Sequence, residues 1–403
     1  MAKKKKKAEP ESDGEQQEYQ KSVLIPQKFR RDSEGNYWEA VKVGDRTLLV
    51  PAPDWAGYIN FYLFEGPDII IEATRKALCR DVPVLRRGAD PVDGGNLLLS
   101  DDEKSELLRT DPLAEKFLRP YMMGKELLYN IPRWCLWLKG AEPADIRKCP
   151  HVLERIERVR QFRLSSRKEA TRKRAETPAL FEAPIESATD YFAIPKTSSE
   201  RRKYIPMAWL PRDVIPGSGI RFAENVGLYH FGVLMSSVHN AWVRTVSGRL
   251  TSRISYSNTL DYNAFPWPNL PEVPWLPDGN PGRLAIEKTA QAILDARALY
   301  PRSSLADLYD ERTMPPELRK AHNANDEAVM TAYGFERHYE DGKFHDEDLA
   351  IRLMYMYKDL THCHENKRHY PNRKLWLKYY PEDAEDDEEV EYDSDYEEGD
   401  DLS

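Results

Sequence analysis

The sequence has 403 residues, of which 40% are hydrophobic and 32% are charged, and its formal net charge is −9. This length is enough for two or three domains of roughly 100 to 200 residues each. No hydrophobic run reaches the ~18 residues that a membrane-spanning helix requires. The lysine-rich start is not followed by an apolar segment either, which argues against a secretory signal. We therefore expect a soluble, cytoplasmic protein that is not bound to a membrane.

Both ends of the chain have the composition of disordered tails. Residues 1–20 are polar and include five consecutive lysines. Residues 382–403 contain 14 acidic residues and no basic one, and such a run of like charge repels itself and cannot bury a core. Removing these 14 negative charges from −9 leaves +5 for residues 1–381. The acidic tail is therefore either a competitor for a basic surface of the same chain or simply a solubilising segment.

Short β-prone runs dominate the first third of the chain. They are residues 37–50 with a turn at Gly44-Asp45, residues 58–73, residues 97–99 and residues 133–138. The first of these runs lies in a hairpin-like lead-in over residues 21–57. A helix should begin at Ser100 or Asp101, where the acidic residues of the first turn suit the positive end of a helix.

Hydrophobic residues spaced three and four apart predict helices further along the chain. One should cover residues 151–175, and its basic face either contacts DNA phosphates or, more commonly for such a face, is solvated. A second, single helix should cover residues 226–247 and end at Gly248. After six prolines between Pro266 and Pro281, which favour an extended linker, helical spacing returns in residues 286–300, 303–310 and 349–360.

These patterns predict an α+β protein. A mixed α/β domain should cover residues 58–268, a proline-rich linker residues 269–283, and a helical C-terminal domain residues 284–381, between disordered termini.

Motifs for catalysis are not found. The segment Asn263-Ala264-Phe265-Pro266-Trp267-Pro268 has the residue types of an amino-methyltransferase loop, but that loop needs Asn or Asp directly before Pro-Pro and an aromatic residue. The Gly-Ser-Gly within residues 216–220 is more typical of a turn than of a cofactor site. In the Pro67-Asp68…Glu72 segment, Thr74 replaces the lysine of a nuclease metal site. We therefore expect no catalytic residue and no bound cofactor on this chain.

The cysteines do not form a metal-binding pattern. The four lie far apart, and Cys135 lies in an apolar run where a buried, reduced thiol is expected. His362, Cys363 and His364, with His369 nearby, lack a second matched pair of ligands. A solvated helix end is thus favoured over zinc, and no metal site is expected.

Four long segments, in order, resemble the MmeI-like type II restriction-modification enzymes, whose parts run nuclease, helical spacer, adenine methyltransferase, target-recognition domain and helical C-terminal domain. These segments are residues 91–138, 194–210, 229–268 and 304–329, within a resemblance that covers about residues 58–375. Segments similar to the nuclease, spacer and methyltransferase are not recognised. The resemblance implies a role in site-specific adenine methylation, with S-adenosylmethionine and the catalytic loop on a separately encoded methyltransferase. It also implies that residues 265–268 leave the recognition domain and that their aromatic rings pack rather than catalyse.

The resemblance implies that double-stranded DNA and a methyltransferase or nuclease subunit are the partners. The predicted DNA-binding residues are Lys196, Ser199, Arg201, Arg202, Arg244, Arg249, Arg253, Ser255 and Asn258. Among them, Arg253, Ser255 and Asn258 lie on a polar connection and are the candidates for contacts with bases. For each residue the alternative is a surface salt bridge or a helix cap, so we expect about half to touch DNA.

Two other functions are compatible with the sequence. The chain could be a folded remnant of a split enzyme without a working partner. It could also be a regulatory or anti-restriction protein whose acidic residues 382–403 imitate DNA.

Overall fold

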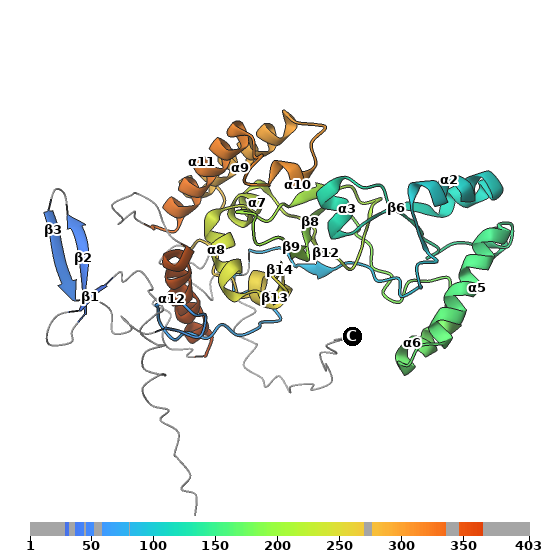
Figure 1. Ribbon diagram of the computed structural model, residues 1–403, viewed down its shortest axis with the longest axis horizontal. Helices are drawn as coiled ribbons and strands as arrows, with labels where there is room; N and C mark the ends of the chain where they lie inside the picture. The colour runs from blue at the N-terminus through green and yellow to red at the C-terminus, as the bar shows by residue number, and fades with distance from the viewer. Residues whose placement is uncertain are drawn as a thin grey trace, which may run out of the picture. The chain divides into compact units, whose positions relative to one another are not determined.

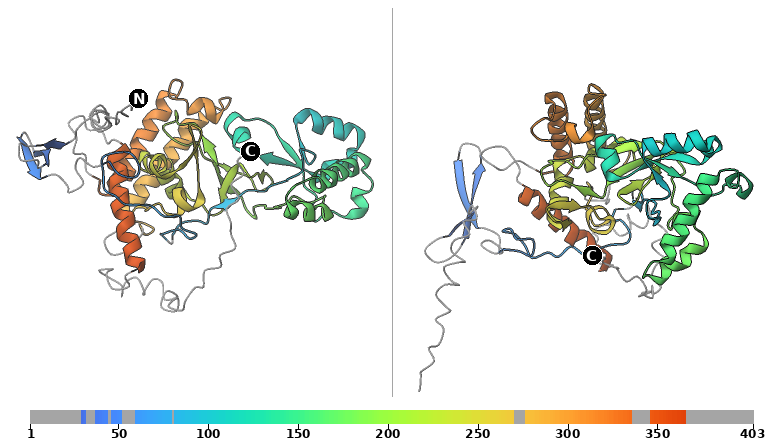
Figure 2. Two further views of the ribbon diagram at one scale, coloured as in Figure 1. Left: turned by 60° about the horizontal axis from the view of Figure 1, so that its bottom comes forward. Right: turned by 45° about the vertical axis from the view of Figure 1, so that its right-hand side comes forward.

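The computed structural model describes residues 29–31, 37–43, 46–51, 59–79, 81–269, 276–335 and 346–365. The chain divides into two compact units, residues 1–69 with 337–344 and residues 70–336 with 345–403. The elements of the two units are shown in Figures 1 and 2. The predicted tails and the side chains of residues 362–364 and 369 lie outside the described residues.

The first unit contains a three-stranded antiparallel sheet. Its strands are β1 (Phe29–Arg31), β2 (Tyr37–Val43) and β3 (Arg46–Pro51), in the order β1-β2-β3. Val43 pairs with Arg46, so the hairpin predicted for residues 37–50 is confirmed.

The predicted strand over residues 58–73 is wrong. Ile59 instead forms an isolated bridge with Glu65, and no strand is assigned between residues 66 and 79. The side chain of Asn60 accepts hydrogen bonds from the backbone amides of Tyr62 and Phe64, at 2.9 and 3.4 Å. Asparagine side chains promote turns in this way, and here the bonding overrides the β propensity of the aromatic neighbours.

The second unit begins with the sheet β11-β6-β7-β5, made of β5 (Leu98–Leu99), β6 (Leu118–Met122), β7 (Trp134–Leu136) and β11 (Ile215–Pro216). Only β11 and β6 run parallel. Helix α2 (Asp101–Thr110) begins where its acidic first turn predicted, and a capping box between Ser100 and Glu103 starts it. The 3₁₀ helix η1 (Pro112–Phe117) and the short helices α3 (Gly124–Tyr129) and α4 (Pro143–Ile146) complete this part.

The predicted helix over residues 151–175 is interrupted. Helix α5 (Pro150–Leu164) ends at Ser165, and α6 (Glu169–Lys173) and the 3₁₀ helix η2 (Arg174–Glu176) follow a break. The Ser166 hydroxyl accepts a hydrogen bond from the Lys168 amide in that break, which competes with continued helix.

One member of the predicted basic face of α5 is internal. Arg163 is fully buried and donates hydrogen bonds of 2.7–3.1 Å to five backbone carbonyls, those of Pro91, Val92, Arg174, Thr177 and Leu180. Arg163 therefore joins α5 to two neighbouring segments.

A second sheet lies at the centre of this unit. Its strands are β4 (Arg86–Arg87), β8 (Tyr191–Pro195), β10 (Ala208–Leu210) and β12 (Ile220–Ala223), in the antiparallel order β10-β8-β12-β4. One face carries a core with Tyr191, Ala193 and Phe222. The Gly-Ser-Gly before β12 forms a turn, as expected, because the Ile220 amide donates to the Gly217 carbonyl.

The single helix predicted for residues 226–247 is two helices. Helix α7 (Leu228–Leu234) stops, and α8 (Ser237–Val246) starts again, because the Ser236 hydroxyl accepts from the His239 amide and caps a new helix. Gly248 does not end a helix but begins a strand. The third sheet, β13-β14-β9, consists of β9 (Thr197–Ser198), β13 (Gly248–Leu250) and β14 (Arg253–Ser255), and the π-helix η3 (Asn258–Asn263) follows it.

The remaining helices confirm the predicted helical character of the C-terminal region. They are α9 (Pro281–Ala298), α10 (Leu305–Leu308), α11 (Pro316–Ala332) and α12 (Asp346–Glu365). Helices α9 and α11 lie side by side in Figures 1 and 2, where they cover α7. Asp326 of α11 accepts hydrogen bonds from the Tyr204 hydroxyl and the Ser237 amide, both at 2.7 Å. These contacts join the helices to the central part of the same unit, and the mixed composition is that of an α+β fold.

Candidate nucleic-acid interface

The segment predicted as a polar connection after α8 is a β-hairpin. Strands β13 and β14 are joined by Thr251 and Ser252, with Thr251 at a φ of +58°. Strand β14 also pairs with β9. Ile254 is buried, whereas Arg249 and Arg253 are exposed. The sheet thus fixes the backbone of the hairpin and presents two arginines to solvent.

The base of the hairpin is held by a buried carboxylate. Asp261 is fully buried in η3 and accepts hydrogen bonds from the Ser247 hydroxyl and the Ser257 amide, which flank the two strands. Burial raises the pKa of Asp261 to about 7, although the two hydrogen bonds oppose this shift. One side chain therefore ties both ends of the hairpin to the core.

Buried aromatic residues support the same hairpin from below. The hydroxyl of Tyr256 lies 2.9 Å from His239 Nε2, and the His239 ring packs edge-on against Phe265 at 4.5 Å between centroids. Burial lowers the pKa of His239 to about 3, so this histidine is neutral. Phe265 and Trp267 are buried and pack 5.6 Å apart. The interpretation of residues 265–268 as a packing segment is thus confirmed.

A groove of about 680 Å³ lies beside the hairpin. Residues from α3, β9, the loop after β9, β14 and the segment before α11 line it. The lining comprises Gly124, Lys125, Leu128, Tyr129, Thr197, Ser198, Ser199, Arg201, Arg202, Arg253, Asp310, Glu311 and Arg312. It contains five basic and two acidic residues, and it combines segments that are far apart in the sequence.

The acidic residues of the groove are already paired. Asp310 contacts Arg312 at 3.0 Å, and Glu311 contacts Arg319 at 3.0 Å. No described carboxylate forms an ion pair with Lys125, Arg201 or Arg253. The groove therefore has an excess of unneutralised positive charge, which suits a polyanionic ligand.

Two buried polar atoms of the groove have no hydrogen-bond partner among the described residues. They are the Ser198 hydroxyl and Nε of Arg202. Buried polar groups are normally hydrogen-bonded, and those left over mark places where water or a ligand completes the structure. A hydroxyl and a guanidinium together can bond to phosphate oxygens or to base edges.

The predicted DNA-binding residues divide into two groups. Ser199, Arg201, Arg202 and Arg253 line the groove, and Ser255 follows Arg253 on β14. Lys196 is exposed directly before β9. For these residues contact with DNA stays a prediction that their placement permits.

Three predicted residues make contacts within the protein. Arg244 forms an ion pair with Asp346 at 2.6 Å and also donates to the Lys203 carbonyl at 2.9 Å. Arg249 donates to the Arg244 carbonyl at 2.8 Å, and Asn258 donates to the Leu85 carbonyl at 2.7 Å. Arg244 thus has the salt bridge foreseen as its alternative, whereas Arg249 and Asn258 bond to backbone carbonyls, and contact of all three with DNA stays a prediction.

Sequence patterns did not single out Lys125 and Arg312. Lys125 lies in the first turn of a six-residue helix, and Arg312 lies in a turn before α11. Neither belongs to a periodic or motif-like pattern. Only the tertiary fold brings them to the groove.

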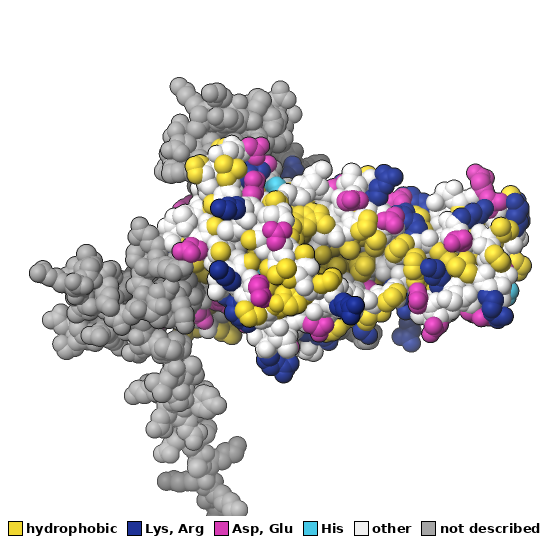
Figure 3. Space-filling model, turned by 90° about the horizontal axis from the view of Figure 1, so that it is seen from above, with side chains coloured by type: hydrophobic (Ala, Val, Ile, Leu, Met, Phe, Trp, Pro, Cys, Tyr) yellow, Lys and Arg dark blue, Asp and Glu magenta, His cyan; other side chains and the backbone are white. Residues whose placement is uncertain are grey.

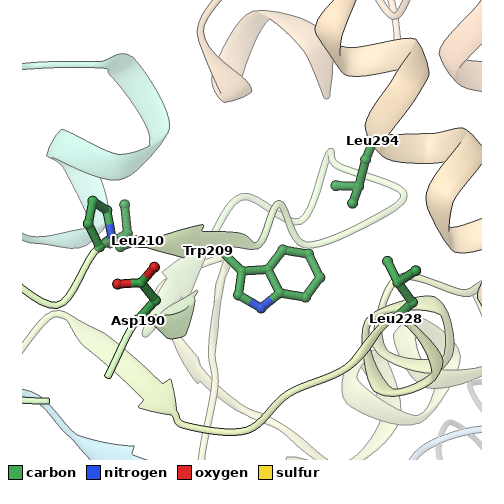
Figure 4. Close-up of a pocket in the computed structure, with 6 residues that line it drawn as sticks. Asp190, Trp209, Leu210, Leu228 and Leu294 are labelled. Carbon is green, nitrogen blue, oxygen red and sulfur yellow. The ribbon is translucent and has the colours of Figure 1, made fainter. Parts of the chain in front are cut away.

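Other pockets differ in chemistry. One of about 450 Å³ is lined by Trp209, Leu210, Pro211, Leu228 and Leu294, with Asp190 as its charged member (Figure 4). A face of the molecule in Figure 3 likewise shows hydrophobic side chains gathered along its middle, with basic and acidic side chains interspersed around them. These apolar surfaces lack the excess positive charge that DNA requires.

Among the described residues, no group of three or more His, Cys, Asp or Glu side chains could hold a metal ion. Within the same part of the chain, no helix has the length and apolar character needed to cross a membrane. The described cysteines, Cys79, Cys135 and Cys149, are buried and free.

Comparison with known proteins identifies the domains around the groove. Residues 65–269 match the family model "MmeI, target recognition domain", and residues 280–363 match "MmeI, C-terminal domain". The hairpin and ten of the thirteen groove residues thus lie in a target-recognition domain of a restriction-modification system, and the other three, Asp310, Glu311 and Arg312, lie in the C-terminal domain that follows it. The chain belongs to the MmeI family.

Two relatives support this assignment. The structure of the type IIL restriction-modification enzyme MmeI in complex with DNA matches with a TM-score of 0.71 and 38% identity, over 82% of this chain and 42% of that chain. DNA methyltransferase A of Bacillus subtilis (strain 168) is 33% identical over 303 residues, which is 75% of this chain and 33% of that protein. The chain spans less than half the length of either relative.

Proposed function

We propose that this chain reads a sequence in double-stranded DNA and thereby directs an adenine methyltransferase, with or without a nuclease, to its target. The observation that carries the proposal is the groove lined mainly by the target-recognition domain, in which Arg201 and Arg253 form no ion pair with a described carboxylate. Phosphates would position the DNA on the basic side chains. Arg253 and Ser255 on the rigid hairpin would contact base edges in the major groove.

In this proposal catalysis comes from another polypeptide. The two family matches account for residues 65–269 and 280–363 with recognition and C-terminal domains, so neither of these domains would supply the methyl-transfer chemistry. A separately encoded methyltransferase would bind S-adenosylmethionine and hold the flipped adenine. This chain would determine which adenine is modified.

The proposal is tested by incubating the purified full-length chain with a pool of random DNA duplexes, alone and together with the methyltransferase of the neighbouring gene. Retained duplexes are sequenced, and methylated adenines are mapped. We expect one enriched motif with a methylated adenine at a fixed position when the methyltransferase is present. If the folded chain enriches no motif in either condition, the proposed function is wrong and a remnant becomes the better explanation.

Truncation of the acidic tail separates a regulatory protein from a specificity subunit. A DNA mimic would inhibit related enzymes through the 14 acidic residues of residues 382–403. Truncation before Glu382 would abolish such inhibition, whereas it would preserve the enriched motif of a specificity subunit. Inhibition that survives the truncation would rule out the mimic.

A further inference from the structure

Arg221 is a half-buried cation of the central sheet that has no counterion among the described residues. It lies on β12, where its direct cross-strand neighbours are Ile194 on β8 and Arg87 on β4. Nε and Nη1 of Arg221 are buried and have no hydrogen-bond partner. Burial lowers the pKa of Arg221 to about 10, and the neighbouring charge of Arg87 acts in the same direction. An arginine in this position costs stability unless something binds it.

Two more cations lie close to Arg221. Lys196 follows the end of β8 at an exposed position, and partial desolvation together with the charges of Arg221 and Arg87 lowers the pKa of its ammonium group. Asp90 contributes a carboxylate to this cluster, but this carboxylate forms an ion pair with Arg87 at 2.8 Å. Glu224 is 3.8 Å from Arg86 and accepts a hydrogen bond from Ser187. No described carboxylate therefore forms an ion pair with Arg221 or Lys196.

The cluster is connected to the hairpin by a single residue. The carbonyl of Lys196 accepts a hydrogen bond from the Tyr256 amide at 2.7 Å, and its amide donates to the Gly219 carbonyl at 2.9 Å. The next residue, Thr197, begins β9 and pairs with Ser255 of the hairpin. A group bound by Lys196 and Arg221 would therefore lie at a fixed register from the residues proposed to contact bases.

We infer that Arg221, Lys196 and Arg87 form a binding site for one phosphate of the DNA backbone, next to the base-reading hairpin. The inference rests on the proposed function and assigns a specific anchor to it. The guanidinium of Arg221 has planar donors that match the oxygens of a phosphate, two of its nitrogens form no hydrogen bond with a described residue, and Lys196 adds a point charge. Such a contact fixes the position of the hairpin along the duplex but does not itself select a base.

The test compares Arg221→Met with the matched variant Arg86→Met. Arg86 lies on the same strand as Arg87, is half-exposed and pairs with Phe222 on the other face of the sheet. Affinity for a cognate and a non-cognate duplex is measured over a series of salt concentrations. Arg221→Met should weaken both complexes by about tenfold and reduce the slope of log K against log salt by about one, because one phosphate contact is lost. Arg86→Met should leave the slope close to that of the wild type.

A second readout does not depend on DNA. Inorganic phosphate, compared with chloride at equal ionic strength, should raise the melting temperature of the wild type but not that of Arg221→Met. Lys196→Met changes an exposed residue and should reduce the salt slope as Arg221→Met does. It tests the same phosphate site if Arg221→Met does not fold.

The outcomes separate this inference from the proposed function. If the wild type selects a DNA motif but neither Arg221→Met nor Lys196→Met changes the salt slope, the phosphate site is wrong and the proposed function stands. If the wild type selects no DNA but phosphate still stabilises it through Arg221, the ligand is a free phosphate and the assignment to DNA is overturned.

Discussion

The carboxylate of Asp261 is hydrogen-bonded to the hydroxyl of Ser247, inside the core at the base of the β13–β14 hairpin. It also accepts from the Ser257 amide. The positions on either side of the hairpin are therefore held by one buried side chain. A rigid support of this kind is what a loop needs if it is to place Arg253 and Ser255 against bases with reproducible geometry.

The first prediction concerns the pH dependence of stability. Burial raises the pKa of Asp261 from 3.8 to about 7 in the folded protein. The folded state thus keeps a proton that the unfolded state loses, so this group's contribution is fully present below pH ~4 and is lost as the pH rises to ~7. Asp261→Asn, which imitates the protonated form, should remove this loss.

The measurement for Asp261 is the free energy of unfolding by urea at pH 4.5 and pH 8, for wild type and Asp261→Asn. The difference in the free energy of unfolding between wild type and Asp261→Asn should change by at most a few kcal/mol between these pH values, because each unit of pKa shift corresponds to ~1.4 kcal/mol. Taking the difference cancels groups common to both proteins, such as the buried His239. If this difference in the free energy of unfolding is the same at both pH values, Asp261 does not titrate in this range.

Arg163 should matter for stability but not for DNA binding. Its five hydrogen bonds go to backbone carbonyls of the protein, so Arg163→Met leaves buried acceptors unsatisfied. We expect a loss of ~3 kcal/mol or more in the free energy of unfolding. The exposed Arg160 on the same helix is the control, and Arg160→Met should change stability by less than ~0.5 kcal/mol. Equal effects of the two substitutions would contradict the structural role of Arg163.

Arg244, one of the residues predicted to bind DNA, should likewise affect stability but not DNA binding. Its guanidinium contacts Asp346 and the Lys203 carbonyl, so Arg244→Met should lower the melting temperature. The salt slope of DNA binding should stay unchanged, whereas Arg201→Met in the groove should reduce it by about one. A reduced slope for Arg244→Met would show that this arginine leaves its ion pair to contact DNA.

Gly232 allows α7 and α9 to approach closely. A Cβ atom at this position would lie 2.6 Å from Cγ2 of Ile286 and 3.1 Å from Cβ of Ala290. Gly232→Ala should therefore destabilise the protein by about 1 to 3 kcal/mol through overpacking. Gly248→Ala is the control, since nothing lies within 4 Å of its Cβ position. Unchanged denaturant midpoints for both variants would mean that the helices can move apart without cost.

The sequence predicted features that depend on local interactions. The start of α2 at Ser100 depends only on residues of its first turn, and it was found where expected. The α7–α8 break was missed because Ser236 is compatible with the interior of a helix as well as with its cap. The turn at Asn60 was missed for a similar reason, since the side-chain bonding that forms it competes with β-prone neighbours.

The site was predictable in outline but not in detail. Charge and polarity indicated the segments around Arg201 and Arg253, which do line the groove. Charge alone does not distinguish an arginine at the surface from one such as Arg163, which is enclosed by carbonyls. Nor does it reveal that Arg221 lacks a counterion, because that depends on which strands pair with β12.

The central claim is that the hairpin reads DNA sequence, and the most direct test is to repeat the random-duplex selection with Arg253→Ala. The account predicts that the enriched motif persists but loses its preference at one base position, with a cost of about 1 to 3 kcal/mol for the original base. Arg201→Met should instead weaken binding to all sequences alike. If Arg253→Ala retained the full motif and lost only overall affinity, Arg253 would be a backbone contact and the hairpin would not be the reading element.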